Sequence, residues 1–436
     1  MEVESITTEE AELNNNNKEG ELEVAPALIA VHPTQHSLVV AIGSDLRVFN
    51  LLGGCPVILG DGSSGHKDSI RAISYGANGK LFVSAGDDKI VKIWTTDSWQ
   101  CIYNVSSEKR VTAVAISNDG RYVSFADKFG VVWVVELEAL HENSAVIDKK
   151  PASMFSHYCS IITGLDFSPD GKYIVSADRD FKIRVTAFPA KPLDGAHEIQ
   201  SFCLGHTKFV SCFTFVCSQD YPQGFLVSGS GDSTVRLWEY ASGSLLHTCE
   251  VGAEAGLHSN GSEEEFLPVI TDLCASRDGS LVAVAAQSFP GVLLLRCNLS
   301  IKSLSVVKKI AITEEGFIPT CLSTATSELL WLVMGVSNLQ GSDSPSLARV
   351  RAISCLGQNS AESAEHKPVI LADSEIPGGK QLLETLQGNL SIEEEVFLKT
   401  AEAVKTAMDN LLIKKQYNVE NREYRKRGRN DKKKYK

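Results

Sequence analysis

A block of about 47 residues that recurs along the chain constrains the fold more than any other feature of the sequence. Each copy has an entry segment, a strand, an Asx-Gly turn, a second strand, an acidic turn and an apolar strand. The Asx-Gly turns mark the copies most clearly, because Asn-Gly and Asp-Gly supply the positive φ angles that two-residue hairpins need. They stand at Asn78-Gly79, Asp119-Gly120, Asp170-Gly171 and Asp278-Gly279.

Seven such blocks fill residues 24–355. Their length is close to the roughly 40 to 45 residues of one four-stranded blade, which predicts an all-β, seven-bladed β-propeller. We expect the strand near Leu28–Val31 to close the ring by joining the last blade, since closure removes exposed sheet edges. The blocks are Ala27–Leu51, Gly65–Ser98, Lys109–Glu138, Ser156–Pro189, Gly205–Gly243, Val269–Asn298 and Phe317–Cys355.

The second half of the block repeats polar residues as well as apolar ones. The segments Ser84–Trp94 and Ser228–Trp238 match each other, Ser176–Thr186 matches both with Asp180 at the acidic position, and Ser124–Val134 is a looser copy. A His precedes each of the two best copies, 28 residues before the Trp in one and 32 in the other.

This pattern resembles the WD-repeat family, in which a His, a Ser, an Asp and a Trp of one blade form a buried hydrogen-bonded tetrad. Buried polar groups need such partners, so these residues are expected to be structural. Their recurrence argues against a catalytic role for either His. The two implied tetrads are His66, Ser84, Asp88 and Trp94, and His206, Ser228, Asp232 and Trp238.

The two ends of the chain differ from the blocks. Residues 1–23 predict a disordered acidic arm, and residues 356–390 a linker. A capping box at Ser391–Glu394 begins an amphipathic helix predicted over 391–415, with apolar positions three and four residues apart. Its apolar stripe packs either on the propeller or on a partner. Residues 416–436 form a basic tail that includes Arg425, Lys426, Arg427, Arg429, Lys432, Lys433 and Lys434.

Charge is distributed unevenly. The chain carries −12, residues 1–23 contribute −7 and residues 414–436 contribute +8, so the rest carries −13. So acidic a body repels nucleic acid, and any role with RNA is therefore expected to be local or to belong to a partner. The tail could contact RNA phosphates, act as a nuclear localisation signal, or be a plain solvated tail.

The sequence shows no constellation that predicts catalysis. The nucleophile-elbow, P-loop, zinc-protease and dinucleotide-binding motifs do not occur. The 11 Cys include no C-x-x-C pair, so neither a metal site nor a disulfide framework is indicated, and no cofactor is expected. With neither a secretory leader nor a membrane-length apolar run, a soluble intracellular protein is expected.

The fourth block carries a patch of both charge signs in its acidic turn. Two Asp, two Arg and a Lys lie within the segment Ala177–Arg184. Mixed charges on a propeller rim suit pairing with another protein.

Three segments, Ala126–Gly130, Ala177–Arg184 and Ser201–Ser211, resemble the non-catalytic WD-repeat subunit of the tRNA (guanine-N7)-methyltransferase. That resemblance implies a propeller without an active site, which docks the catalytic methyltransferase subunit as a heterodimer and stabilises its competent conformation for forming N7-methylguanosine in tRNA. It also implies a nuclear location, with a cytoplasmic pool left open.

The family's docking segment reads Asp-Arg-Asp-Glu-Lys-Ile-Arg. Phe181 stands where the family has Glu. In the third segment, Lys208 also replaces a Glu of the family. These replacements put one interface salt bridge in doubt and suggest an apolar contact in its place. The local alternatives are that Asp180 is the tetrad acid of its blade and that Arg184 is a solvated strand residue. The implied interface residues are Lys128, Arg179, Asp180, Phe181, Lys182, Arg184 and Lys208.

Two other functions stay open. A generic adaptor, such as a substrate receptor of a ubiquitin ligase, usually carries Trp-Asp-x-Arg after a blade, and neither Trp94–Asp97 nor Trp238–Ala241 fits that pattern. An enzyme with an unfamiliar site on the top of the propeller is disfavoured by the motif search.

Overall fold

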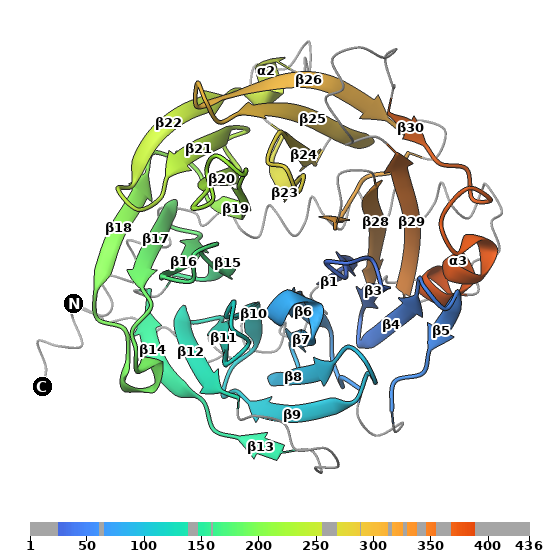
Figure 1. Cartoon of the computed structure of the whole chain (residues 1–436), viewed down its shortest axis with the longest axis horizontal. Helices are drawn as coiled ribbons and strands as arrows, with labels where there is room; N and C mark the ends of the chain where they lie inside the picture. Colours follow the sequence, from blue (N-terminus) through green and yellow to red (C-terminus); the bar gives the residue numbers. More distant parts are fainter. Residues whose placement is uncertain are drawn as a thin grey trace, which may run out of the picture.

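The computed structural model describes residues 25–60, 65–137, 147–157, 160–254, 268–287, 289–312, 316–325, 329–337, 346–354 and 368–388. Within these ranges the strands form seven sheets arranged in a ring around a central axis (Figure 1). The fold is therefore the seven-bladed propeller that the repeat predicts.

Each of the first three blades is an antiparallel sheet in which the strands follow one another outward from the axis of the ring. Blade one contains β2 (Leu28–Val31), β3 (Ser37–Ile42), β4 (Asp45–Asn50) and β5 (Cys55–Val57). Blade two contains β6 (Ile70–Gly76), the 3-10 turn η1 (Ala77–Gly79), β7 (Leu81–Gly86), β8 (Ile90–Thr95) and β9 (Cys101–Ser106). Blade three contains β10 (Val111–Ile116), β11 (Tyr122–Asp127), β12 (Val131–Glu136) and β14 (Ala152–Ser156).

The next three blades repeat this arrangement. Blade four contains β15 (Ile162–Phe167), β16 (Tyr173–Asp178), β17 (Lys182–Ala187), the 3-10 turn η2 (Pro192–Asp194) and β18 (Ile199–Leu204). Blade five contains β19 (Val210–Val216), β20 (Phe225–Ser230), β21 (Val235–Glu239) and β22 (Ser244–Cys249), followed by α2 (Val251–Glu254). Blade six contains β23 (Ile270–Ala275), β24 (Leu281–Ala286), β25 (Gly291–Asn298) and β26 (Ser303–Ala311).

The seventh blade closes the ring with strands from both ends of the chain. It contains β27 (Cys321–Thr324), β28 (Leu329–Ser337), β29 (Ser346–Ser354) and β30 (Val369–Ile370), and β1 (Ala25–Pro26) pairs with β28. The Ala27 N–H continues this contact by donating to the Gly335 carbonyl at 2.7 Å. The expectation that Leu28–Val31 joins the last blade is therefore wrong by a few residues, because that segment is the innermost strand of blade one.

The core lies between neighbouring blades. The second strands β3, β7, β11 and β20 are buried at every position, because each blade is covered on one face by the blade before it and on the other by the blade after it. Between blades four and five, Ile183 and Val185 belong to one buried cluster with Leu226 and Trp238. This packing fixes the blades rigidly and leaves their connecting turns at the rims of the ring.

The Asx-Gly turns use two geometries rather than one. At Ala77, Asn78 and Gly79 all three residues have positive φ, 50°, 55° and 90°, and Gly76 pairs with Leu81, so this turn has four residues where two were expected. In the other three turns only the Gly has positive φ, and the Asp accepts a hydrogen bond from the hydroxyl of a Ser two residues earlier. That Ser also accepts the N–H of the next strand, so these turns close through side chains.

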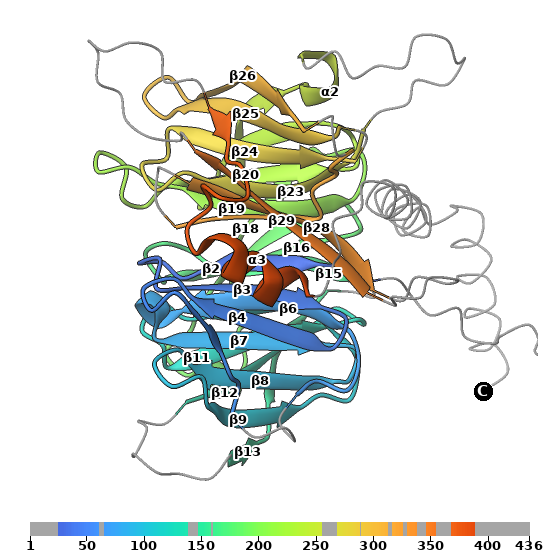
Figure 2. The ribbon, with the colours of Figure 1, turned by 90° about the vertical axis from the view of Figure 1, so that its right-hand side faces the viewer.

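The segment expected to be a linker is partly folded. Strand β30 pairs with β29, and the helix α3 (Gly379–Gln387) follows it and packs on blades one and seven (Figures 1 and 2). Leu382 and Leu386 are buried against Phe49 and Val350. The assignment of 356–390 as a linker is therefore wrong for residues 368–388, because a two-residue strand and a short helix complete the seventh blade.

A further strand covers the outer edge of blade two. β13 (Ile147–Lys149) comes from the segment between β12 and β14 of blade three and pairs in parallel with β9. Lys149 fastens it, because its ammonium donates to the Glu136 carbonyl at 3.1 Å. The arm at 1–23, the helix predicted over 391–415 and the tail at 416–436 lie outside the described residues.

Candidate partner-binding rim

The polar tetrad of blade two joins its second and third strands to the segment that enters the blade. His66 is hydrogen-bonded to Asp88 through Nδ1 and to the Ser84 hydroxyl through Nε2, both at 2.8 Å, and the Trp94 indole donates to the same hydroxyl at 3.0 Å. Since a carboxylate only accepts, Nδ1 carries the proton and Nε2 accepts from the Ser. The polar side chains of the tetrad are thus hydrogen-bonded to one another within the blade.

Blade five repeats this geometry. His206 is hydrogen-bonded to Asp232 at 3.0 Å and to the Ser228 hydroxyl at 2.8 Å, and Trp238 donates to that hydroxyl at 2.8 Å. Burial alone would raise the pKa of Asp232, but hydrogen bonds from His206 and from Thr207 and Thr234 outweigh it, so the pKa lies below its usual range. The pKa of Asp88 is lowered in the same way, with burial opposed by His66.

Blade four uses a different residue for the acid than the repeat predicts. His157 is hydrogen-bonded to Asp178 and to the Ser176 hydroxyl, both at 2.8 Å. The Asp178 side chain is fully buried and also accepts the N–H groups of Asp180 and Lys182. The alternative that Asp180 is the tetrad acid is therefore wrong. The hydrogen bond to His157 is made by Asp178, which stands two residues before Asp180.

Blade three shows the same displaced acid without the His. Asp127 lies at the end of β11, as Asp178 does at the end of β16, and it accepts the N–H groups two and four residues later. Its other carboxylate oxygen accepts the Trp133 indole N–H at 2.9 Å. The acidic turns of blades three and four are thus built alike, which leaves Phe129 and Asp180 in the corresponding place at the rim.

Arg184 is anchored inside the propeller rather than solvated. Its guanidinium lies 4.4 Å from the ring centre of Phe155 and donates to the Ser156 carbonyl at 3.2 Å and to the Thr186 hydroxyl at 3.0 Å. Burial lowers the pKa of Arg184. The alternative of a solvated strand residue is wrong, because Arg184 ties blade four to the outer strand of blade three.

The remaining residues implied by the resemblance lie on one rim of blades three to five, the rim that also carries the tetrad His and Asp residues. Lys128 and Phe129 are exposed in the β11–β12 turn, Arg179 to Phe181 form the β16–β17 turn, and Lys182 begins β17. Lys208 lies in the β18–β19 connection, beside His206 of the tetrad. Residues far apart in sequence are thus brought to a single surface.

Further apolar and basic residues on or beside this rim were missed in the sequence. Phe129 is exposed, and the ammonium groups of Lys109 and Lys128 lie 5.5 and 5.6 Å from its ring centre. Phe202 and Leu204 on the outer strand β18 are exposed opposite Arg184 and Lys182. Their signal in the sequence is an apolar residue at positions that face solvent, which shows only once the strand's register is known.

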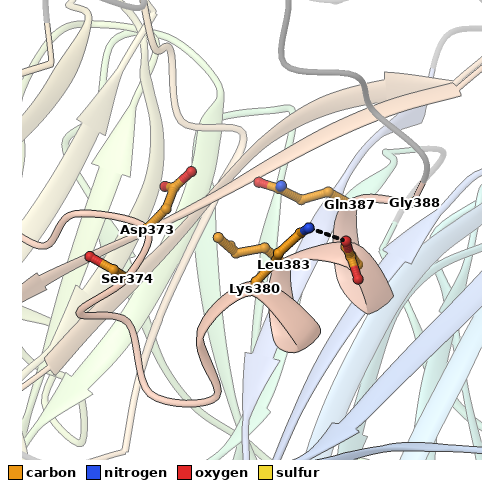
Figure 3. A pocket seen from close by; sticks show the side chains of 7 residues that line it. Asp373, Ser374, Lys380, Leu383, Gln387 and Gly388 are labelled. Carbon is orange, nitrogen blue, oxygen red and sulfur yellow. Dashed lines mark ion pairs between the residues drawn. The ribbon is translucent and has the colours of Figure 1, made fainter.

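A pocket lies on the opposite side of the ring from blade four. It has a volume of about 540 Å³ beside α3 (Figures 1 and 3). Nearby, Arg349 and Arg351 of β29 both pair with Asp373, so this pocket belongs to the packing of the seventh blade. The residues that line it are Asp373, Ser374, Lys380, Leu383, Glu384, Gln387 and Gly388.

The described parts of the chain hold no group of three or more His, Cys, Asp or Glu side chains placed to bind a metal ion. Among the same residues, no helix combines the length and apolar character that crossing a membrane requires.

Solved structures share the fold. The chains titled "Structure of U3-55K" and "Crystal structure of RRP9 WD40 repeats" both superpose with a TM-score of 0.56 over 72% of this chain, and they cover 89% and 88% of their own lengths. Both are 21% identical in sequence. At that identity, the similarity shows only that the propeller fold is shared.

Sequence comparisons are more specific. The family model described as tRNA methyltransferase TRM82 WD40 domain matches residues 152–349, and the one described as WD domain, G-beta repeat matches 61–95. The tRNA (guanine-N(7)-)-methyltransferase non-catalytic subunit wdr4 of Danio rerio is 34% identical over 54% of this chain. That alignment spans 53% of the fish protein, about half of its length.

The counterpart from Xenopus laevis, also named the non-catalytic subunit wdr4, is matched over more of its length. It is 31% identical over 324 residues, which are 72% of this chain and 76% of the frog protein. The chain thus belongs to the family of tRNA (guanine-N(7)-)-methyltransferase non-catalytic subunits.

Proposed function

We propose that this chain is the non-catalytic scaffold that binds and stabilises the catalytic subunit of a tRNA (guanine-N7)-methyltransferase, and that N7-methylguanosine formation in tRNA requires it. The rim of blades three and four carries the proposal. Asp178 takes the tetrad role, and the β16–β17 turn presents Asp180 and the exposed Phe181 at the rim, next to Lys182. The fixed blades hold these residues in place before the partner arrives.

Electrostatics support a division of labour between the two subunits. The chain without its ends carries −13, which disfavours direct binding of tRNA by the propeller. The catalytic subunit therefore supplies the active site and most of the tRNA-binding surface. The basic tail, with Arg425 to Lys434, either contacts tRNA phosphates or directs the complex to the nucleus.

Reconstitution with purified subunits tests this function. Methyl transfer to tRNA is measured with the catalytic subunit of the same organism alone, with this chain alone, and with both. We expect activity from the pair that greatly exceeds that of the catalytic subunit, and none from this chain. Undiminished activity of the catalytic subunit by itself, or methyl transfer by this chain alone, would contradict the proposal.

The adaptor alternative is tested by affinity purification of the tagged chain from its own cells. Recovery of the methyltransferase supports the scaffold. Recovery of ubiquitin-ligase components without the methyltransferase supports the adaptor.

A further inference from the structure

Phe181 occupies a backbone conformation that disfavours a bulky side chain. Its φ is +68°, in the left-handed region where a non-glycine residue is strained. The same turn position is taken by Lys89 in blade two, Ser233 in blade five and Gly130 in blade three, all with positive φ. The turn thus sets the conformation, and a phenylalanine is the least suited of these four residues to adopt it.

The Phe181 side chain is also 43% exposed. The ring therefore leaves apolar surface in solvent in addition to the strain in its backbone. A partner that covers the ring removes the exposed surface, and the gain offsets the strain, because burying an aromatic side chain in an interface stabilises a complex strongly.

Apolar and basic groups continue the surface around Phe181. Leu204 and Phe202, which are 59% and 41% exposed, pair across the sheet with Lys182 and Arg184. The Lys182 side chain is 40% exposed, and Lys128 is exposed on the neighbouring turn. On a body that is acidic as a whole, this cluster has more basic than acidic groups, with Lys128, Lys182 and Arg184 against Asp180, and apolar side chains among them.

We infer that Phe181 is the apolar anchor of the interface, and that the facing surface of the catalytic subunit is an apolar pocket flanked by carboxylates. This inference rests on the proposed function and deepens it. Charge complementarity selects the partner's carboxylates, since Lys182 follows Phe181 in the chain and Lys128 is exposed on the neighbouring turn, and the exposed ring selects the apolar pocket. Phe181 then decides which catalytic subunit this propeller accepts.

Binding of the full-length chain to the purified catalytic subunit is measured for three variants at Phe181. Phe181→Gly removes the ring and suits the left-handed backbone, so the dissociation constant is expected to rise about tenfold or more while the melting temperature stays close to that of the wild type. Phe181→Leu keeps an apolar side chain and should stay within about threefold of the wild type. Phe181→Glu should bind more weakly than Phe181→Gly, since a carboxylate would meet carboxylates.

Lys89→Gly is the matched control. It makes the same backbone change at the same turn position of blade two, with φ +64°, and should leave affinity unchanged. Wild-type affinity for Phe181→Gly or Phe181→Glu overturns the inference while the proposed function stands. If Phe181→Gly folds poorly, Phe181→Glu against Phe181→Leu decides. Failure of the wild-type chain to bind the catalytic subunit overturns the proposed function itself.

Discussion

At the scale of the residue, the two aspartates of blade four do different work although they stand two positions apart. The repeat places Asp180 level with Asp88 and Asp232, and no pattern distinguishes it from Asp178 as the acid that reaches His157. The structure resolves the choice through the register of β16, whose last residue is Asp178. The two tetrads with a Trp were predictable because all four residue types recur at matching places.

Replacing each aspartate of that pair separates folding from binding. Asp178→Ala leaves His157 and two buried N–H groups without their acceptor, and we expect it to lower the free energy of unfolding by about 2 kcal/mol or more. Asp180→Ala should lower that free energy by less than Asp178→Ala does, and it should weaken binding of the catalytic subunit. Denaturant unfolding and a binding assay are made on both variants. Equal loss of stability in the two would contradict the assignment.

Asp232 gives a pH dependence to stability. Its folded pKa lies below the unfolded value of about 3.9, so the ionised carboxylate stabilises the fold above that value. The contribution is lost as the pH falls below about 4 towards the folded pKa. Asp232→Asn should therefore lower the free energy of unfolding at about pH 7. The difference in this free energy between the variant and the wild type should be smaller at about pH 3. Denaturant midpoints at both pH values measure this, and a constant difference would be evidence against it.

At the scale of the element, the repeat predicts blades well where hairpins are regular and poorly where strands are short. The seventh blade takes β1 and β30, two residues each, from opposite ends of the chain. Two residues carry no periodicity, and residues 355–368 separate β30 from its partner β29, so the sequence predicted a linker. The helix α3 is only nine residues long, and its apolar face shows as such only against Phe49.

Helix α3 is expected to stabilise the propeller. Leu382 is fully buried between blades one and seven, and Leu382→Ala should lower the free energy of unfolding by roughly 2 to 5 kcal/mol because it leaves a cavity. Lys380→Ala, on the exposed side of the same helix, is the control and should change it by less than about 0.5 kcal/mol. Denaturant unfolding compares the two. If Leu382→Ala is as stable as the control, α3 is not part of the folded unit.

At the scale of the whole molecule, the notable property is a locally basic rim on an acidic body. Total charge and the acidic composition were evident from the sequence, but the approach of Lys109 and Lys128 to the exposed Phe129 ring depends on the fold, because the two lysines come from different turns. The rim therefore steers an acidic partner face towards itself while the rest of the surface repels it.

The rate constant for association with the catalytic subunit should accordingly fall as the salt concentration rises. Raising the ionic strength from about 0.1 M to about 1 M shortens the Debye length from about 10 Å to about 3 Å, which screens the attraction between exposed charges. The association rate constant should fall by roughly tenfold or more, while the dissociation rate changes less, because the apolar contact of Phe181 is not screened. Stopped-flow or surface-binding kinetics across this range measure both rates. Lys128→Ala should weaken the salt dependence of association, and Lys380→Ala in α3, on the far side of the ring, should not. If salt accelerated association, the acidic body rather than the basic rim would govern the encounter.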